Sequence, residues 1–461
     1  MAKIMGFLFY FLFVFVYGSS LVHSRSLTQS IKTTVLDVSA SIRKTHNVLS
    51  FNHEALLNQQ EQNSIPSNSL TMQLRSRASM HKPSHSDYKS LTLARLERDS
   101  ARVKSLITKL DLVANGIAQS NLKPVDMGNR VEFGVEELQG PIISGTSQGS
   151  GEYFSRVGIG KPPSQVYMVL DTGSDVNWVQ CSPCADCYQQ ADPIFEPAAS
   201  ASYIPLTCET SQCKSLDVSE CRNNTCLYEV SYGDGSFTVG DFVTETITLD
   251  SVSVNNVTIG CGHNNKGLFI GATGLLGLAS TLEFDSPIPP KAVIAPLHRN
   301  SKLDTFYYLG LTGVSVGGEL LPIPESNFQM GPTGTSGVII DSGTAVTRLQ
   351  SDTYNSLRDS FVRSTKNLPF AEGVSLFDTC YNLSTVSSVE VPTVSFHFPD
   401  EKELLLPAKN YLIPVDAEGT FCFAFAPTSS SLSIIGNVQQ QGTRVGFDLA
   451  NSLIGFSPSN C

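Results

Sequence analysis

A short acidic motif occurs twice in this 461-residue chain. Residues 169–174 read Val-Leu-Asp-Thr-Gly-Ser, and residues 339–344 read Ile-Ile-Asp-Ser-Gly-Thr. Each copy is followed, about 100 residues later, by two apolar residues and a glycine, at 275–277 and 434–436. Two features repeated in the same order predict two lobes of one design, and two copies are too few for a solenoid.

The chain from Tyr153 onward has the pattern of an all-β body. Short apolar runs rich in Val, Ile, Thr, Tyr and Phe are separated by Gly, Pro, Asn and Asp, as at Phe242–Leu249, Phe306–Val316 and Val391–Phe398. Runs of this composition and length favour strands. The clearest helix is expected over Thr353–Thr365, where the apolar residues fall on one face.

The charge of the chain is divided unevenly. Residues 1–130 hold 16 Lys and Arg against 8 Asp and Glu, a net +8, whereas residues 131–461 hold 15 against 34, a net −19. Residues 91–110 combine basic side chains with apolar residues at helical spacing. Opposite charges predict that this helix covers the acidic body, and a membrane-surface helix is the alternative. A net −19 argues against nucleic-acid binding by the body.

The N-terminus has the pattern of an export signal. Lys3 precedes an apolar run from Ile4 to Tyr17, which is short for a membrane span of about 20 residues. Small residues precede a plausible cleavage after Ser24. We therefore interpret residues 1–24 as a signal peptide and expect no membrane span in the mature protein.

The cysteines and the glycosylation sequons agree with secretion. All 11 cysteines lie between Cys181 and Cys461, and export to an oxidising compartment makes disulfides the expected state. A metal or redox site at the Cys-x-x-Cys-x-x-Cys run of residues 181–187 is the alternative. Sequons predict N-glycosylation at Asn223, Asn256 and Asn382.

The repeated motif also offers a specific chemistry. If the two lobes pack symmetrically, Asp171 and Asp341 meet at the interface, and carboxylates about 3 Å apart cannot both ionise. One then acts as general base on a water molecule, and the other as general acid toward a carbonyl. This chemistry needs no metal. Beyond residue 130 the histidines are His263, His298 and His397, and they lack the spacing of a zinc hydrolase.

The paired motifs resemble those of the pepsin-type aspartic peptidases. The cysteine-rich stretch Cys181–Cys226 resembles the insertion of the plant, nepenthesin-like branch of that family, and the resemblance covers about residues 145–461. It implies an all-β, bilobal fold in which the active site lies between two lobes related by a pseudo-two-fold axis.

The resemblance assigns roles to individual residues. Asp171 and Asp341 match the catalytic dyad, and Ser174 and Thr344 match the hydroxyls that hydrogen-bond its outer oxygens. Asp175 is interpreted as a surface or turn acid. The family's flap and the tryptophan that holds its tyrosine are matched by Tyr232, Gly233, Ser236 and Trp178. Without the resemblance, the flap motif would be read as an ordinary hairpin turn.

The resemblance further implies the domain organisation and the function. It predicts an inhibitory propeptide over about 25–130, an N-terminal lobe over 131–298 with the cysteine-rich insertion, and a C-terminal lobe over 299–461. The expected protein is a monomeric aspartic endopeptidase that cleaves polypeptides without a cofactor. Its expected location is the secretory pathway, ending outside the cell or in the cell wall, with the vacuole or endoplasmic reticulum as alternatives. The alternative function is a catalytically impaired protein of the same fold that binds or inhibits other enzymes.

One stretch departs from the family pattern. After residues 275–277 relatives continue through a Gly-rich turn, a short helix and further strands, and about 25–30 residues of this pattern are missing after Leu278. The missing stretch normally carries the partner of the last cysteine. The resemblance therefore implies that Cys380 pairs with Cys422 and that Cys461 stays free or pairs between chains. We expect the shortened lobe to fold poorly or to have reduced activity, because exposed sheet edges and a smaller core both destabilise it.

Overall fold

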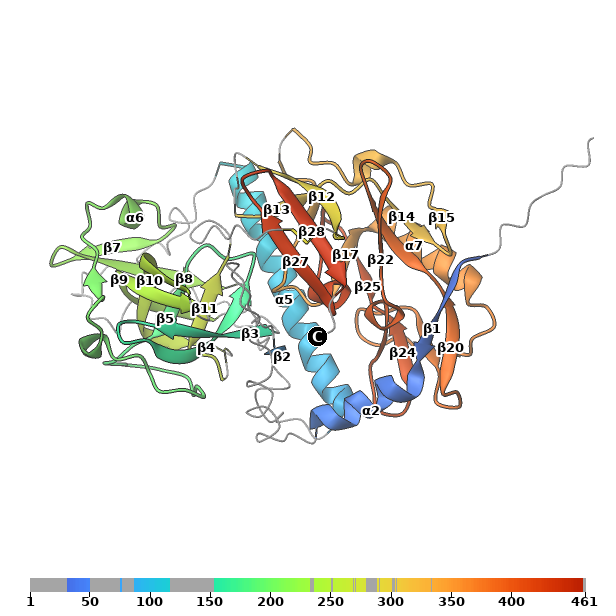
Figure 1. Cartoon of the computed structure of the whole chain (residues 1–461), viewed down its shortest axis with the longest axis horizontal. Coiled ribbons are helices and arrows are strands. Elements are labelled where there is room, and N and C mark those ends of the chain that lie inside the picture. Colours follow the sequence, from blue (N-terminus) through green and yellow to red (C-terminus); the bar gives the residue numbers. More distant parts are fainter. Residues whose placement is uncertain are drawn as a thin grey trace, which may run out of the picture.

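The two copies of the repeated motif end equivalent strands in two different sheets. In the computed structural model, β4 (Ser164–Asp171) ends on the first aspartate and runs parallel to β11 (Gly274–Gly277). β16 (Gly337–Ile340) ends just before Asp341 and runs parallel to β26 (Leu432–Ile435). In each lobe the motif strand thus pairs with the apolar-apolar-Gly strand, and the predicted bilobal, all-β architecture is confirmed (Figure 1).

The structure describes most of the chain after residue 153 and three earlier segments. The described residues are 31–49, 75–76, 87–116, 153–232, 236–249, 252–267, 269, 271–278, 288–289, 291–300, 303, 305–332 and 334–458. The predicted signal peptide, Gly233 of the flap motif and Cys461 lie outside these ranges.

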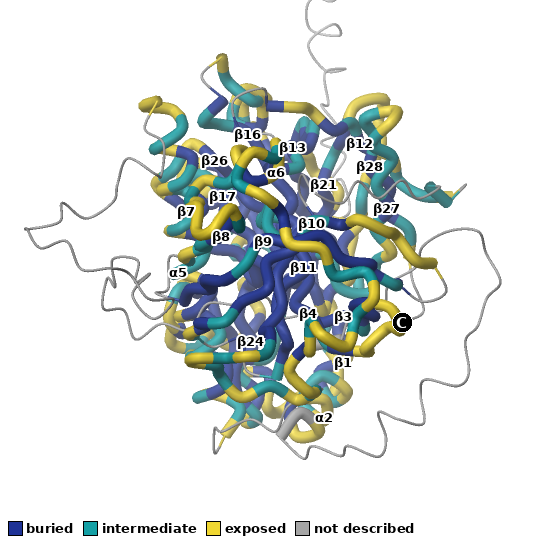
Figure 2. The backbone as a smooth tube through the Cα atoms, turned by 90° about the vertical axis from the view of Figure 1, so that its left-hand side faces the viewer, coloured by how far each residue is buried: buried dark blue, intermediate teal, exposed yellow. Residues whose placement is uncertain are grey.

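The N-terminal lobe is built on one sheet with the strand order β2-β3-β4-β11-β5-β10-β9-β8-β7, and β6 pairs with β9. The long hairpin of β9 (Phe237–Leu249) and β10 (Val252–Lys266) carries most of its pairing, and Figure 2 shows β9 and β11 largely buried. The other elements of the lobe are β2 (Arg75–Ser76), β3 (Tyr153–Ile159), β5 (Trp178–Gln180), the 3₁₀ turn Pro197–Ala199, β6 (Ile204–Pro205), α6 (Ser211–Lys214), β7 (Ser219–Arg222) and β8 (Thr225–Ser231).

The C-terminal lobe contains, in the part that the structure describes, an eight-stranded sheet of order β25-β17-β26-β16-β13-β12-β28-β27 and two four-stranded sheets of orders β15-β14-β21-β22 and β18-β19-β24-β23. Its elements are β12 (Val293–His298), β13 (Tyr307–Leu309), β14 (Gly313–Val316), β15 (Glu319–Leu320), the 3₁₀ turn Glu325–Asn327, β17 (Thr347–Gln350), α7 (Ser351–Ser364), β18 (Phe370–Ala371), β19 (Cys380–Asn382), β20 (Ser388–Pro392), β21 (Val394–Phe398), β22 (Lys402–Leu405), the 3₁₀ turn Ala408–Asn410, β23 (Leu412–Pro414), β24 (Thr420–Phe423), β25 (Phe425–Thr428), α8 (Asn437–Gln440), β27 (Thr443–Asp448) and β28 (Leu453–Pro458).

The core of the C-terminal lobe forms under α7, the helix expected from the sequence. Its apolar face buries Tyr354, Leu357 and Phe361. The ring of Phe361 stacks on that of Phe423, with centroids 4.3 Å apart. Burial of each such side chain stabilises the fold by about 1.5–3 kcal/mol.

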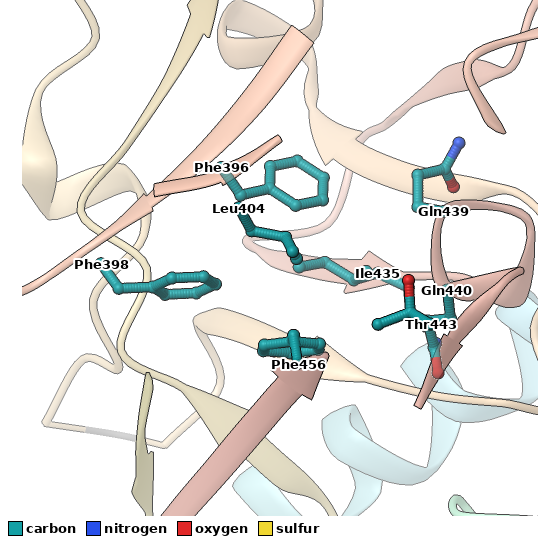
Figure 3. Close-up of a pocket in the computed structure, with 8 residues that line it drawn as sticks. All are labelled: Phe396, Phe398, Leu404, Ile435, Gln439, Gln440, Thr443 and Phe456. Carbon is teal, nitrogen blue, oxygen red and sulfur yellow. Dashed lines mark hydrogen bonds between the residues drawn. The ribbon is translucent and has the colours of Figure 1, made fainter. Parts of the chain in front are cut away.

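A small pocket lies in this lobe, and Ile435 of the apolar-apolar-Gly strand is one of the residues that line it. Phe396, Phe398 and Phe456 line it, and neither motif aspartate does (Figure 3). The rings of Phe398 and Phe456 are stacked, with their planes 7° apart. We interpret this pocket as a gap in the packing of an aromatic core rather than as a functional site.

The basic N-terminal segment packs on the body. β1 (Thr33–Asp37) pairs antiparallel with β20 of the C-terminal lobe and leads into α2 (Val38–Leu49). The helix expected over 91–110 is present as α5 (Tyr88–Ala114), and its N-terminal cap is Asp87. Figure 1 shows α5 running between the two lobes. Among the described residues, no helix is long and apolar enough to cross a membrane.

The chain changes sheets soon after β11. The next described strand, β12, pairs with β13 and β28 and so belongs to the large C-terminal sheet. The sequence predicts that the N-terminal lobe extends to residue 298. In the structure β12 already pairs within the C-terminal sheet, so the change of sheet comes before this strand. The sequence is expected to depart from the family pattern in this short passage, after Leu278.

Ten cysteines pair in five disulfides in the described part of the chain. Four of these disulfides hold the N-terminal lobe, and the fifth, Cys380–Cys422, bridges β19 and β24. The four are Cys181–Cys261, Cys184–Cys187, Cys208–Cys221 and Cys213–Cys226. The three cysteines of residues 181–187, for which a metal or redox site was the alternative, are therefore all in disulfides. One of the 11 cysteines, Cys461, is left over.

The cysteine arithmetic predicts one free thiol in each monomer. Denatured, unreduced monomer should react with about one equivalent of a thiol-specific label, and the label should map to Cys461, because the other cysteines are oxidised. The Cys461→Ser variant is the control and should not react. A wild-type monomer whose Cys461 is blocked would contradict the prediction.

Candidate active site

The motif aspartates are fixed by matching hydrogen bonds in the two lobes. Asp171 and Asp341 are both fully buried. The backbone N–H of Gly173 donates to Asp171 Oδ1 at 2.9 Å, and that of Gly343 donates to Asp341 Oδ1 at 3.0 Å. Each carboxylate is therefore held by the turn that immediately follows its own strand.

The hydroxyls of the motif complete this arrangement. Ser174 Oγ donates to Asp171 Oδ2 and Thr344 Oγ1 donates to Asp341 Oδ2, each at 2.5 Å. The lobes also bond to each other, because Ser342 N–H donates to Thr172 Oγ1 at 2.9 Å and Thr172 N–H donates to Ser342 Oγ at 3.3 Å. These reciprocal bonds have the approximate two-fold symmetry that the sequence repeat predicts.

One guanidinium group from α5 lies between the two carboxylates. Arg102 Nη1 and Nη2 donate to Asp171 at 2.9 and 2.5 Å, and Arg102 Nε and Nη2 donate to Asp341 at 3.0 Å each. The planar fork of arginine suits such paired contacts with carboxylates. A Cβ at Gly343 would lie 2.4 Å from Arg102 Cζ, so a residue with a side chain there would displace the guanidinium.

Charge explains the ionisation of this cluster. Burial opposes the charged form of Asp341, but the Arg102 guanidinium together with the hydrogen bonds from Thr344 and Gly343 holds the pKa of Asp341 below its ordinary value. Burial likewise opposes the charge of Arg102, yet the carboxylates of Asp171 and Asp341 raise the pKa of Arg102 above its ordinary value. The guanidinium thus lies between two buried carboxyl groups, and 12% of its own side chain is exposed.

Two further ion pairs attach α5, one to each lobe. Lys109 Nζ lies 2.8 Å from Asp175 Oδ2, which also accepts from Thr305 Oγ1 at 2.9 Å. Asp99 Oδ2 lies 2.6 Å from Nη2 of the buried Arg348. Asp175, interpreted from the sequence as a surface or turn acid, is partly exposed and pairs with Lys109 of the helix.

Burial raises the pKa of Asp99 above its ordinary value, although Arg348 and two backbone N–H groups act in the opposite direction. Asp99 therefore takes up a proton at a higher pH than an exposed aspartate does. Its titration has the opposite sign to that of Asp341, whose pKa is lowered.

The structure places the tryptophan and the tyrosine of the flap motif side by side. Trp178 Nε1 donates to Tyr232 Oη at 2.8 Å, and Trp178 is completely buried. Phe269 packs edge-on against both rings. The backbone N–H of Tyr232 donates to the carbonyl of the buried Ser236, which closes the base of the hairpin.

The remaining predicted positions lie away from the dyad. The sequon residues Asn223, Asn256 and Asn382 are all exposed, as glycan attachment requires. In the described ranges, no cluster of three or more His, Cys, Asp or Glu side chains is arranged to hold a metal ion.

Sequence reasoning missed two residues of the site. Arg102 lies within the basic stretch that was singled out, but the pattern did not distinguish it from its basic neighbours. Arg348 follows Asp341 by seven residues, as Trp178 follows Asp171. Aligning the two motif copies would have shown that Arg348 and Trp178 occupy equivalent places in the two lobes.

Comparison with known proteins covers most of the chain. The family models described as xylanase inhibitor N-terminal and xylanase inhibitor C-terminal match residues 153–282 and 306–458. Protein ASPARTIC PROTEASE IN GUARD CELL 2 of Arabidopsis thaliana is 45% identical over 399 residues, which are 80% of this chain and 83% of that protein. Aspartic proteinase nepenthesin-1 of Nepenthes gracilis is 37% identical over 423 residues, which are 82% of this chain and 95% of that protein.

Solved structures agree on the fold. The crystal structure of edgp has a TM-score of 0.55 at 19% identity and covers 69% of this chain and 93% of its own. The crystal structure of basic 7S globulin from soybean has a TM-score of 0.52 at 18% identity and covers 68% and 94%. Together with the relatives above, these findings show that the chain belongs to the pepsin-like aspartic protease family, in the plant branch that contains the nepenthesins.

Proposed function

We propose that this chain is the inactive precursor of an aspartic endopeptidase of the secretory pathway. The observation that carries the proposal is the matched pair of buried carboxylates, Asp171 and Asp341, which both reach one central group. A dyad with this symmetry can hold a water molecule at the place that Arg102 occupies in the precursor.

Hydrolysis follows from the electrostatics of the pair. Once Arg102 has left, two adjacent buried carboxylates share a single proton, because both cannot be charged. The ionised member takes a proton from the bound water, which attacks the peptide carbonyl, and the protonated member donates to the carbonyl oxygen, giving a tetrahedral diol. The diol then returns a hydroxyl proton to the dyad, the carbon–nitrogen bond breaks, and the leaving nitrogen takes the proton that the dyad had removed from the water. Ser174 and Thr344 hold the outer oxygens of the dyad, so that the inner oxygens stay aimed at the water.

The flap would close over the substrate. The hydrogen bond from Trp178 to Tyr232 fixes the tyrosine at the base of that hairpin. Polypeptides are the expected substrates. A preference for apolar residues flanking the cleaved bond is expected from the family resemblance alone.

The N-terminal segment would keep the precursor inactive, because α5 fills the site. The sign of its pH dependence follows from Asp341. A carboxyl group whose pKa is depressed by docking supports docking above its ordinary pKa of about 4, and that support is lost as the pH falls through the depressed value. Acid therefore favours release of α5. Asp99 does not contribute to this release, since docking raises its pKa.

The alternative is an inactive binding protein with the same fold. It is supported by the short passage between β11 and β12, where the resemblance implies that part of the family pattern is missing. The matching family models also carry the description of xylanase inhibitors. On this alternative, the chain would cleave no peptide after α5 has been released.

Replacement of one dyad member tests the endopeptidase. Asp171→Asn keeps the size of the side chain but removes the carboxylate, so we expect acid-pH cleavage of a denatured protein to fall by about 10²-fold or more. The wild-type activity should be blocked by pepstatin. The matched control is Asp400→Asn at an exposed turn with positive φ, which asparagine also adopts. Full activity in Asp171→Asn, or pepstatin-insensitive activity in the wild type, would reject the dyad.

Replacement of the central arginine tests the docked helix. Arg102→Gln leaves both carboxylates without a cation, and removing one partner of a buried pair destabilises by at most about 3–5 kcal/mol, less if one carboxylate takes up a proton. Amides of α5 should then exchange with solvent at least about tenfold faster at neutral pH. Lys104→Gln is the control, because it removes the same charge from an exposed position of the same helix. Equal protection of α5 in both variants would contradict the account.

A further inference from the structure

The Asp99 carboxylate of α5 lies in a binding pocket made entirely by the C-terminal lobe. Its Oδ2 accepts from Arg348 Nη2 at 2.6 Å. Its Oδ1 accepts from the backbone N–H of Ala345 at 2.5 Å and of Val346 at 3.4 Å. Both oxygens therefore have donors, in the manner of a specific carboxylate site.

The donors of this pocket are held by the lobe and not by the helix. Ala345 and Val346 follow the motif turn directly, and Arg348 lies on β17 in the large sheet. Arg348 Nη1 donates to the carbonyl of Val346 at 2.9 Å, which fixes the plane of the guanidinium. Only 6% of the Arg348 side chain is exposed. The pocket should therefore keep its shape when α5 is removed.

Removal of α5 takes Asp99 away and leaves the positive charge of Arg348 without its carboxylate partner. Among the described residues, Asp99 is the only carboxylate within ion-pair distance of Arg348. Arg348 is 6% exposed while α5 is docked, so departure of the helix uncovers a cation without its ion-pair partner. The vacated cleft thus favours any ligand that brings a carboxylate to the same place.

The spacing on α5 locates the pocket relative to the dyad. Asp99 and Arg102 are three residues apart on one helix, so their Cβ atoms are about 5–6 Å apart. An extended peptide advances about 3.3 Å per residue. A substrate side chain in the pocket therefore belongs to a residue about two positions from the bond that faces the dyad.

The position seven residues after each motif aspartate holds a different side chain, with a different partner, in each lobe. Trp178 and Arg348 both lie seven residues after their motif aspartates. In the N-terminal lobe this position holds the flap tyrosine, Tyr232. In the C-terminal lobe the residue at this position, Arg348, binds the carboxylate of Asp99. The two halves of the cleft are therefore chemically unequal.

We propose that Arg348, with the backbone N–H groups of Ala345 and Val346, is a specificity-determining subsite of the mature enzyme. It selects substrates with an aspartate or glutamate side chain about two residues from the cleaved bond, and in the precursor Asp99 occupies it as a substrate mimic. This proposal rests on the proposed endopeptidase function for its turnover measurements only, because binding to the pocket does not need a working dyad.

The test compares peptides that differ in one side chain. The full chain is processed at acid pH or with an added protease, and native mass measurement verifies the loss of α5. Peptide pairs with Asp or Asn two residues from the cleaved bond, on either side, are assayed at about pH 5, where aspartate is ionised. Wild type should prefer one Asp peptide over its Asn partner by about 10–100-fold in kcat/KM, as expected for hydrogen bonds to a charged group.

Variants of the pocket assign the preference to Arg348. Arg348→Gln should reduce the ratio to about one while Asn peptides are still cleaved, and Arg348→Lys, which keeps the charge but not the fork, should give an intermediate ratio. Arg358→Gln is the control, because Arg358 pairs with Asp359 and Asp378 outside the cleft. A wild type without preference overturns the subsite even if the variants do not fold, and so does a preference that Arg348→Gln retains.

A binding measurement separates failure of the subsite from failure of the enzyme. If processed wild type cleaves no peptide, the affinities of the same Asp and Asn peptides are measured by fluorescence anisotropy. Tighter binding of an Asp peptide supports the subsite and rejects only the endopeptidase. Equal binding of both members of every pair overturns the subsite.

Discussion

The contact of Arg102 with Asp171 and Asp341 is the interaction on which the rest of the structure depends. Two carboxylates from different lobes are buried side by side, and such a pair repels itself unless a proton or a cation lies between them. The guanidinium supplies that cation and donates to both carboxylates at once. The same contact therefore stabilises the lobe interface, docks α5 and fills the site.

The other contacts of α5 extend this arrangement to both lobes. Lys109 reaches Asp175 on the N-terminal side and Asp99 reaches Arg348 on the C-terminal side. The Lys109–Asp175 pair follows the uneven charge of the sequence, whereas the Asp99–Arg348 pair has the opposite polarity, with the acid on the helix and the base on the body. The donors and acceptors that hold the helix through Arg102 and Asp99 belong to the body, namely the dyad for Arg102 and Arg348 for Asp99.

Much of the fold and the dyad could be predicted from the sequence, because the Asp-x-Gly motif and its apolar-apolar-Gly partner are both repeated and identify paired strands in each lobe. Arg102 could not be singled out, since residues 91–110 carry several basic side chains and helical spacing alone does not show which of them faces the dyad. Arg348 was missed because a lone arginine in the short strand Thr347–Gln350 shows no partner until Asp99, 249 residues earlier, is placed beside it.

The most direct test of the account measures pepstatin binding to the unprocessed chain at one mildly acidic pH, by calorimetry, for wild type and Arg102→Gln. Working at a single pH keeps the intrinsic titration of the dyad out of the comparison. If Arg102 holds a complete dyad closed, the variant should bind pepstatin at least about tenfold more tightly than wild type. Equal affinity, or binding by neither protein, would contradict the claim that Asp171 and Asp341 form a competent site blocked by α5.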